Sequence, residues 1–239
     1  MKCAAAALAV ALLVSSAGPG AQPISLIPST DGRVAHAAWQ HSAKPERWIV
    51  SLHGTGGSAV TDVGIWHKLI GGRAIGILAI QWWLGEADAY LLPLEIYREI
   101  DVTARKLGIE PGHAMLHGFS RGAANLYAVA AIDAGRGRKL FSIYVASSGG
   151  VAYDYPPIRA ILEGRFGPRP LAKTRWITAC GGLDPNPDRD GCGGMRHTGD
   201  WLKNQGALLI LAIEDWESGH GALHRNPRNA ARVLDLLMK

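Results

Sequence analysis

The sequence contains no internal repeat, little cysteine and no concentrated block of charge. Because no segment of roughly 20–50 residues recurs, solenoids and other repeat architectures are excluded. The 25 lysines and arginines are scattered apart from small clusters at 136–139 and 165–173. The net charge of +5 therefore indicates a solvated basic face, and no nucleic-acid partner is expected. The 48% hydrophobic and 19% charged residues, over 239 positions, are typical of a globular protein with one sizeable α/β domain.

Long apolar runs are also missing, since Cys3–Val14 is too short to anchor the chain stably in a bilayer. Lys2 precedes this run, and small residues at 15–17 and 20–21 follow it. A positive start, an apolar run and small residues are the pattern of a signal peptide. We therefore expect a signal peptide at 1–21, cleaved near 17–21, and a single catalytic domain at 22–239. The mature protein would be secreted or periplasmic.

Only three cysteines are present, and the signal peptide would remove Cys3. Cys180 and Cys192 then remain as a pair. In an exported protein, an even pair favours a disulfide over a metal site or a redox centre. The bridge would close a short loop that is rich in glycine, proline and aspartate.

Buried apolar stretches alternate with helical patterns along the remaining chain. We expect an edge strand at 33–40, preceded by a tether or edge segment at 22–28, and further strands at 47–53, 74–81, 114–117, 141–146, 175–179 and 207–213. Helices are expected at 93–107, 123–134, 198–204 and 227–237, and a poorly formed one after Gly57. Strands that are apolar on both faces predict a mostly parallel sheet with helices on both sides. Ligands of such sheets bind at the carboxyl ends of the strands.

The most informative motif is Gly118-Phe119-Ser120-Arg121-Gly122, which lies between an apolar strand and a helix-forming segment. A Gly-x-Ser-x-Gly sequence in this context predicts a strained turn that presents the serine hydroxyl above the sheet. Side chains at the two glycine positions would collide with neighbouring backbone. Ser120 is therefore the expected nucleophile, and the Arg121 amide is one expected donor to an oxyanion.

A serine nucleophile needs a base, and the base needs an acid. Asp184 follows the strand at 175–179 after a glycine turn, and Asp188 and Asp190 in the same loop are its competitors. His220, flanked by two glycines after the last strand, is the expected base, with His224 as the alternative. The remaining histidines of the central strands are assigned to packing: His53, His113 and His117.

A second glycine-rich turn, His53-Gly54-Thr55-Gly56-Gly57, ends the first central strand. Its glycines allow backbone N–H groups to face a substrate, so we assign the second oxyanion donor to Thr55, with Gly56 next in order. A phosphate-binding role is disfavoured because no Lys-Ser/Thr follows the glycines.

Together these motifs resemble the α/β-hydrolase superfamily of serine hydrolases. They are most similar to the secreted bacterial esterases grouped with polyhydroxybutyrate depolymerases and feruloyl esterases. The resemblance extends from Arg47 to Leu237, in the order His-Gly-x-Gly-Gly, Gly-x-Ser-x-Gly, Gly-Gly-x-Asp-Pro and Gly-His-Gly. It implies a Ser-His-Asp triad, no metal or organic cofactor, and a small or polymeric ester as substrate.

The substrate pocket is expected beside three tryptophans, Trp82, Trp83 and Trp216, of which at least one would line it. The segment between 146 and 175, where this fold often inserts a lid, has about 28 residues and several prolines. It leaves room for one short helix near 158–162, so a short or absent lid is predicted. The expected function is cleavage of carboxylic esters through an acyl-enzyme. The alternatives are a peptidase or amidase, an acyltransferase, and a non-catalytic binding protein.

Overall fold

The computed structural model describes residues 23–41, 44–85, 89–137 and 139–239, so the expected signal peptide lies outside the described residues. The strands are β1 (Ser25–Pro28), β2 (Ala35–Trp39), β3 (Arg47–Leu52), β4 (Ile75–Ile80), β5 (Ala114–Phe119), β6 (Phe141–Ser147), β7 (Arg175–Gly181) and β8 (Leu208–Asp215). The helices are α1 (Ala59–Leu69), α2 (Pro93–Lys106), α3 (Arg121–Ala134), α4 (Pro156–Leu162), α5 (Cys192–Asn204), α6 (Ala222–Arg225) and α7 (Pro227–Leu237).

All eight strands form one sheet in the order β1-β2-β4-β3-β5-β6-β7-β8. The strands from β4 to β8 in that order are parallel, while β1 and β2 run antiparallel to their neighbours. This is the predicted α/β-hydrolase fold. Because the six parallel strands share a direction, their carboxyl ends meet at one edge, and the site motifs lie there.

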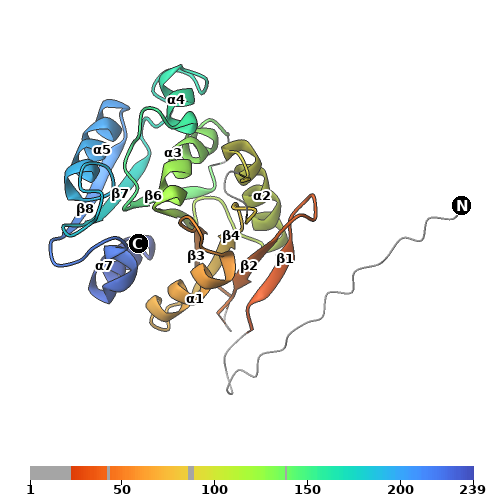
Figure 1. Ribbon diagram of the computed structural model, residues 1–239. Helices are drawn as coiled ribbons and strands as arrows, with labels where there is room; N and C mark the ends of the chain where they lie inside the picture. Colours follow the sequence, from red (N-terminus) through yellow and green to blue (C-terminus); the bar gives the residue numbers. More distant parts are fainter. Residues whose placement is uncertain (1–22, 42–43, 86–88, 138) are drawn as a thin grey trace, which may run out of the picture.

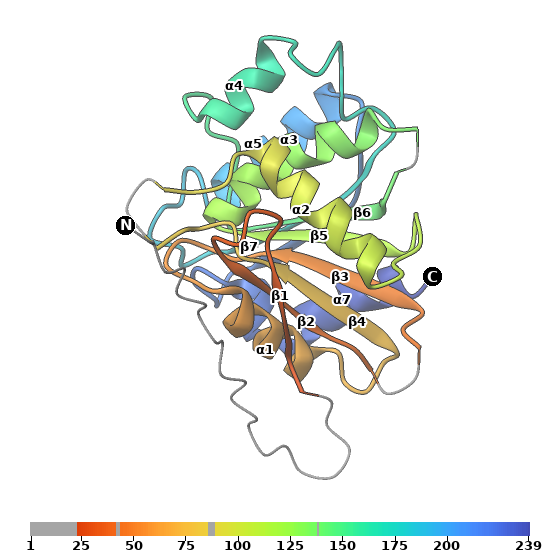
Figure 2. The ribbon, with the colours of Figure 1, turned by 90° about the vertical axis from the view of Figure 1, so that its right-hand side faces the viewer.

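Helices cover both faces of the sheet (Figures 1 and 2). One layer contains α2, α3 and α5, whose apolar side chains pack with Leu52, Leu116 and Trp176 in one buried cluster. The other contains α1 and α7, which pack with Ile49, Ile77 and further buried side chains in a second cluster. Two apolar faces explain why the central strands carry continuous apolar runs instead of alternating patterns.

The amino-terminal part of the sheet corrects one prediction. The strand at 35–39 is not an edge strand, since it lies between β1 and β4. A tight turn with Gly32 at a φ of 73° and a hydrogen bond from Ser29 N–H to Val34 O reverses the chain. The short strand β1 therefore takes the edge position.

Three helices also differ from the prediction. α5 begins at Cys192, well before the expected start at 198. α1 is a regular helix of 11 residues, capped by the Ser58 side chain and holding Val63 and Trp66 in the core. The valine, threonine and glycine residues of this segment are weak helix formers, which is why a poor helix was expected. Burial of the Trp66 side chain in the core stabilises the helix instead. The short helix α6, directly after His220, was not expected.

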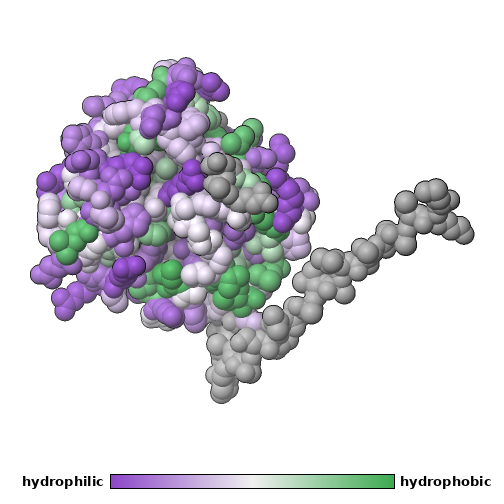
Figure 3. All heavy atoms as spheres, viewed as in Figure 1, coloured by the Kyte–Doolittle hydropathy of each residue, from purple (hydrophilic) through white to green (hydrophobic). Residues whose placement is uncertain are grey.

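The connection between β6 and β7 contains a single helix, α4, of seven residues, which agrees with the predicted short lid. Figure 3 shows that the face seen in Figure 1 is mainly hydrophilic, with apolar side chains in separate small areas. Among the described residues, no helix combines the length and the apolar character needed to cross a membrane.

Candidate active site

A cavity of about 380 Å³ opens at the carboxyl ends of the central strands. It brings together the residues of both glycine-rich turns, Ser120, Arg121 and Thr55. Asp190, considered above as a competing acid, lines it as well. Five further lining residues were not identified from the sequence: Gly149, Gly150, Asp154, Tyr155 and Arg189. These come from the segments that follow β6 and β7, whose course depends on the folded sheet.

Ser120 occupies the turn between β5 and α3 with a φ of 54° and a ψ of −122°. This backbone conformation is unfavourable for a residue with a Cβ, and such strain is concentrated at functional sites. A Cβ on Gly122 would lie 2.1 Å from the Leu52 carbonyl oxygen, and one on Gly118 would lie 2.7 Å from the Ala123 backbone. The motif glycines therefore let α3 approach the sheet closely enough to form this turn.

Two backbone segments lie next to Ser120. Arg121 is the first residue of α3, so its N–H has no acceptor within the helix. Gly54 packs against the elbow, since a Cβ there would lie 3.2 Å from Ser120 Cβ, and this contact places Thr55 at the cavity. Gly56 has a φ of 71° and forms the turn, but it does not line the cavity. Thr55 and Arg121 thus line the same cavity as Ser120.

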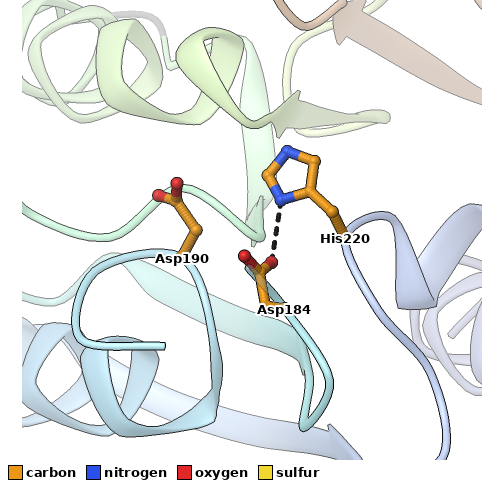
Figure 4. A group of neighbouring side chains, drawn as sticks. All are labelled: Asp184, Asp190 and His220. Atoms are coloured by element: carbon orange, nitrogen blue, oxygen red, sulfur yellow. Dashed lines mark hydrogen bonds and ion pairs between the residues drawn. The ribbon is translucent and has the colours of Figure 1, made fainter. Parts of the chain in front are cut away.

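The buried carboxylate of Asp184 accepts a hydrogen bond from His220, with 2.8 Å between Oδ2 and Nδ1 (Figure 4). Its other oxygen accepts from the Asn186 N–H at 2.9 Å. Of its two competitors, Asp188 is exposed, and Asp190 is buried and paired with Arg189 at 2.8 Å. Within this loop, therefore, Asp184 is the aspartate that is hydrogen-bonded to His220.

His220 and His224 have different surroundings. The side chain of His220 is 32% exposed, and its ring lies 4.9 Å from that of Phe119, the residue before Ser120. His224 is largely buried against Trp66, His117 and Phe119, and its Nε2 is buried without a hydrogen-bond partner. Within the described chain, Ser120 Oγ makes no hydrogen bond to either imidazole. The partial exposure of His220 and its hydrogen bond to Asp184 favour His220 over His224 as the base.

The three tryptophans differ in burial and in position relative to the cavity. Trp82 does not line the cavity, because it is fully buried, stacked on the His53 ring and hydrogen-bonded to the His53 carbonyl. Trp216 does not line it either: it is 56% exposed and packs over Gly182, with the Arg196 guanidinium 5.2 Å from its ring. Trp83 is not among the lining residues either, but it is half-buried and lies beside the side chain of Arg121, which does line the cavity.

A second polar cluster lies buried beneath the elbow. Ser51 and His117 are register partners on β3 and β5, with 2.9 Å between Oγ and Nδ1, and Ser51 also donates to Asp62 on α1. All three side chains are buried, so this Ser-His-Asp set has no path to a substrate. Burial raises the pKa of Asp62 to about 6 and lowers the pKa of His117 well below its usual value. It also lowers the pKa of His224 to about 4.

These shifts predict that acid destabilises the protein partly through His224. Between pH 6.5 and 4 the unfolded chain binds a proton at this histidine and the folded chain does not, so stability falls as the pH falls. His117 acts in the same direction, whereas Asp62, which is protonated first in the folded state, acts in the opposite one. We expect His224→Phe to gain stability over the wild type by about 3 kcal/mol between these pH values, at 1.36 kcal/mol per unit.

Urea unfolding at several pH values would measure this difference. A phenylalanine keeps a planar aromatic ring at this position and leaves no buried unpaired nitrogen. Its somewhat larger size changes the stability equally at every pH, so the change with pH isolates the proton. Parallel stability curves for the two proteins from pH 7 to 4 would contradict the assignment.

The predicted disulfide is present between Cys180 and Cys192. It joins the end of β7 to the first residue of α5 and closes the loop that carries Asp184. In the loop-entropy model a bridge over about a dozen residues contributes roughly 3 kcal/mol to stability. It also restrains the carboxylate that is bonded to His220.

Reduction of the bridge should therefore lower the melting temperature by roughly 6–12 °C. If Asp184 positions the base, kcat should fall more than KM changes. The Cys180→Ala/Cys192→Ala double variant is the control, because its melting temperature should not respond to the reductant. Mass spectrometry of the unreduced protein should find the two thiols oxidised, and free thiols would contradict the bridge.

Among the described residues, Asp184, Asp190 and His220 are the group with ligand-type atoms close together, all within 4.8 Å (Figure 4). These atoms already have partners, since Asp184 binds His220 Nδ1 and Asp190 binds Arg189. The arrangement therefore suits an acid that orients a histidine.

Comparisons with known proteins agree on the fold. The structure is similar to that of the esterase Est22, at 13% identity with a TM-score of 0.64, over 92% of this chain and 81% of the other. It is similar to a carboxylesterase from Mesorhizobium loti, at 15% identity and 0.61, over 91% and 99%. A third is an esterase from Pyrobaculum calidifontis, at 16% identity and 0.62, over 90% and 81%. No protein-family model matches the sequence, and no curated protein does.

Proposed function

We propose that this protein is an exported serine hydrolase that cleaves carboxylic esters through an acyl-enzyme on Ser120. The observation that carries the proposal is the Asp184–His220 hydrogen bond beside a strained serine elbow. The esterase and carboxylesterase neighbours support ester substrates. The apolar amino-terminal run and the disulfide support export. Within this class, the sequence motifs favour the group of the polyhydroxybutyrate depolymerases and feruloyl esterases.

In the first half of the reaction, Ser120 Oγ attacks the ester carbonyl carbon, and its proton passes to His220 Nε2. The N–H groups of Thr55 and Arg121 hold the resulting oxyanion. When the carbon–oxygen bond to the alcohol breaks, the alcohol takes that proton from His220. Asp184 remains ionised, fixes the tautomer with a proton on Nδ1 and stabilises the imidazolium.

In the second half, water attacks the acyl-enzyme. Its proton passes to His220, a new tetrahedral intermediate forms, and the bond to Ser120 Oγ breaks. The proton returns to Ser120 as the carboxylic acid leaves. The short connection through α4 leaves the cavity open to water, which favours hydrolysis over acyl transfer to another alcohol.

Two measurements test the proposal. A fluorophosphonate probe should label Ser120, which peptide mapping would identify, and an unlabelled protein would point to a binding function. A panel of alkyl esters, aryl esters and peptide anilides should show turnover of the esters. Faster hydrolysis of the anilides would assign a peptidase instead.

A further inference from the structure

The Arg121 side chain is a cation in the cavity that has no acidic partner among the described residues. Its Cζ lies 5.7 Å from the centre of the Trp83 ring and 5.4 Å from that of Tyr90. Arg121 is in no ion pair that the described part of the chain forms. The two rings hold the guanidinium by cation–π contacts, and the guanidinium also interacts with the Tyr155 hydroxyl. An arginine has five N–H donors, so donors remain for a ligand.

The other arginine of the cavity, Arg189, already has acidic neighbours. Arg189 binds Asp190 through two hydrogen bonds of 3.0 and 2.8 Å. The pKa of Arg189 is raised chiefly by Asp190 and further by Asp154, so both carboxylates act on this arginine. Arg121 is thus the cavity cation that an anionic ligand would complete. A guanidinium presents a planar fork that matches a carboxylate.

The sheet order places Arg121 on one side of the nucleophile. Trp83 and Tyr90 follow β4, which lies on the opposite side of β5 from β7 and β8. Asp184 and His220 follow β7 and β8. Since His220 protonates the leaving alcohol in the proposed reaction, the alcohol half lies on its side, and the acyl half extends toward Arg121.

We infer that the enzyme prefers esters whose acyl half ends in a carboxylate, which the Arg121 guanidinium binds. This inference rests on the proposed function and adds its substrate class: monoesters of short dicarboxylic acids. Arg121 is the residue next to Ser120, so its guanidinium lies within one side-chain length of the nucleophile and a short acyl chain is enough to reach it. The net charge of +5 also favours the approach of an anion.

The test compares monoethyl glutarate with ethyl pentanoate, which have the same acyl length and differ in the terminal carboxylate. We expect kcat/KM to be about 10- to 100-fold higher for the charged ester, as a charged hydrogen bond can provide. In Arg121→Met the preference should fall to about one or below, because the stem remains and the charge is lost. The ratio of the two esters is the readout, since a general loss of packing would lower both rates together.

Arg196→Met is the matched control. Its guanidinium also lies over a tryptophan, Trp216, but it is paired with Glu214 and lies outside the cavity. This variant should keep the preference for the charged ester. Inhibition by glutarate should exceed inhibition by pentanoate in the wild type, and the difference should disappear in Arg121→Met.

A third substrate, the pentanoate ester of glycolic acid, carries its carboxylate on the alcohol half. Its rate relative to ethyl pentanoate should not depend on Arg121. If only this ester depends on Arg121, the assignment of the acyl side is wrong. Equal rates for monoethyl glutarate and ethyl pentanoate in the wild type would overturn the inference and leave the proposed function intact. If no ester is hydrolysed, the proposed function fails and the inference fails with it.

Discussion

Ser120→Ala should abolish ester hydrolysis, with a loss on the order of 10⁶ in kcat, while the protein keeps its fold. The reason for the loss is chemical, because alanine has no oxygen on which an acyl-enzyme can form. The fold should survive because the strained φ of 54° is set by the backbone around it. The Ser120 N–H bonds to the Ser147 carbonyl, and the glycines beside it keep α3 close to the sheet. Alanine makes no new demand on that turn.

Ser148→Ala is the matched control for this variant. Ser148 also has a positive φ, of 44°, and its buried hydroxyl has no hydrogen-bond partner among the described residues. It follows Ser147 at the end of β6, close to the elbow. This variant should retain most of its turnover. If Ser120→Ala kept a few per cent of wild-type kcat, the nucleophile would have to be another residue.

The elbow was predictable from sequence because its constraints are local. A strand, a motif with two glycines and a helix former leave few conformations for Ser120, and the structure has the expected one. The parallel order of the central strands was predictable for the same kind of reason, since continuous apolar runs have to be covered on both faces.

The positions of β2 and Trp82 were not predictable, because they depend on tertiary partners. A strand at 35–39 has the same pattern at an edge or one strand further in, and only the pairing of Ser25–Pro28 decides between them. Two adjacent tryptophans at a strand end look equivalent in sequence. In the structure the His53 carbonyl accepts from the Trp82 indole, and this fixes Trp82 in the core, while Trp83 is half-buried beside the Arg121 side chain.

His220→Ala should be nearly as damaging as Ser120→Ala, with a loss on the order of 10⁶ in kcat, because the residues of a triad act as a unit. Removal of the imidazole leaves the Ser120 proton without an acceptor. His224→Phe should retain activity, since that ring is largely buried among Trp66, His117 and Phe119. The two variants thus separate a loss of the base from a change in packing next to Phe119.

Initial rates on a simple alkyl ester, together with thermal unfolding of both variants, would measure this difference. A reversal, with His224→Phe inactive and His220→Ala active, would mean that His224 is the base.

Asp184→Asn tests whether the carboxylate orients His220. An asparagine can occupy the same position, but its amide favours the His220 tautomer that carries the proton on Nε2. In that tautomer Nε2 cannot accept the proton of Ser120. The variant should therefore lose about 10⁴ in kcat. If Asp184→Asn were active, the 2.8 Å contact with His220 Nδ1 would serve only to hold the loop.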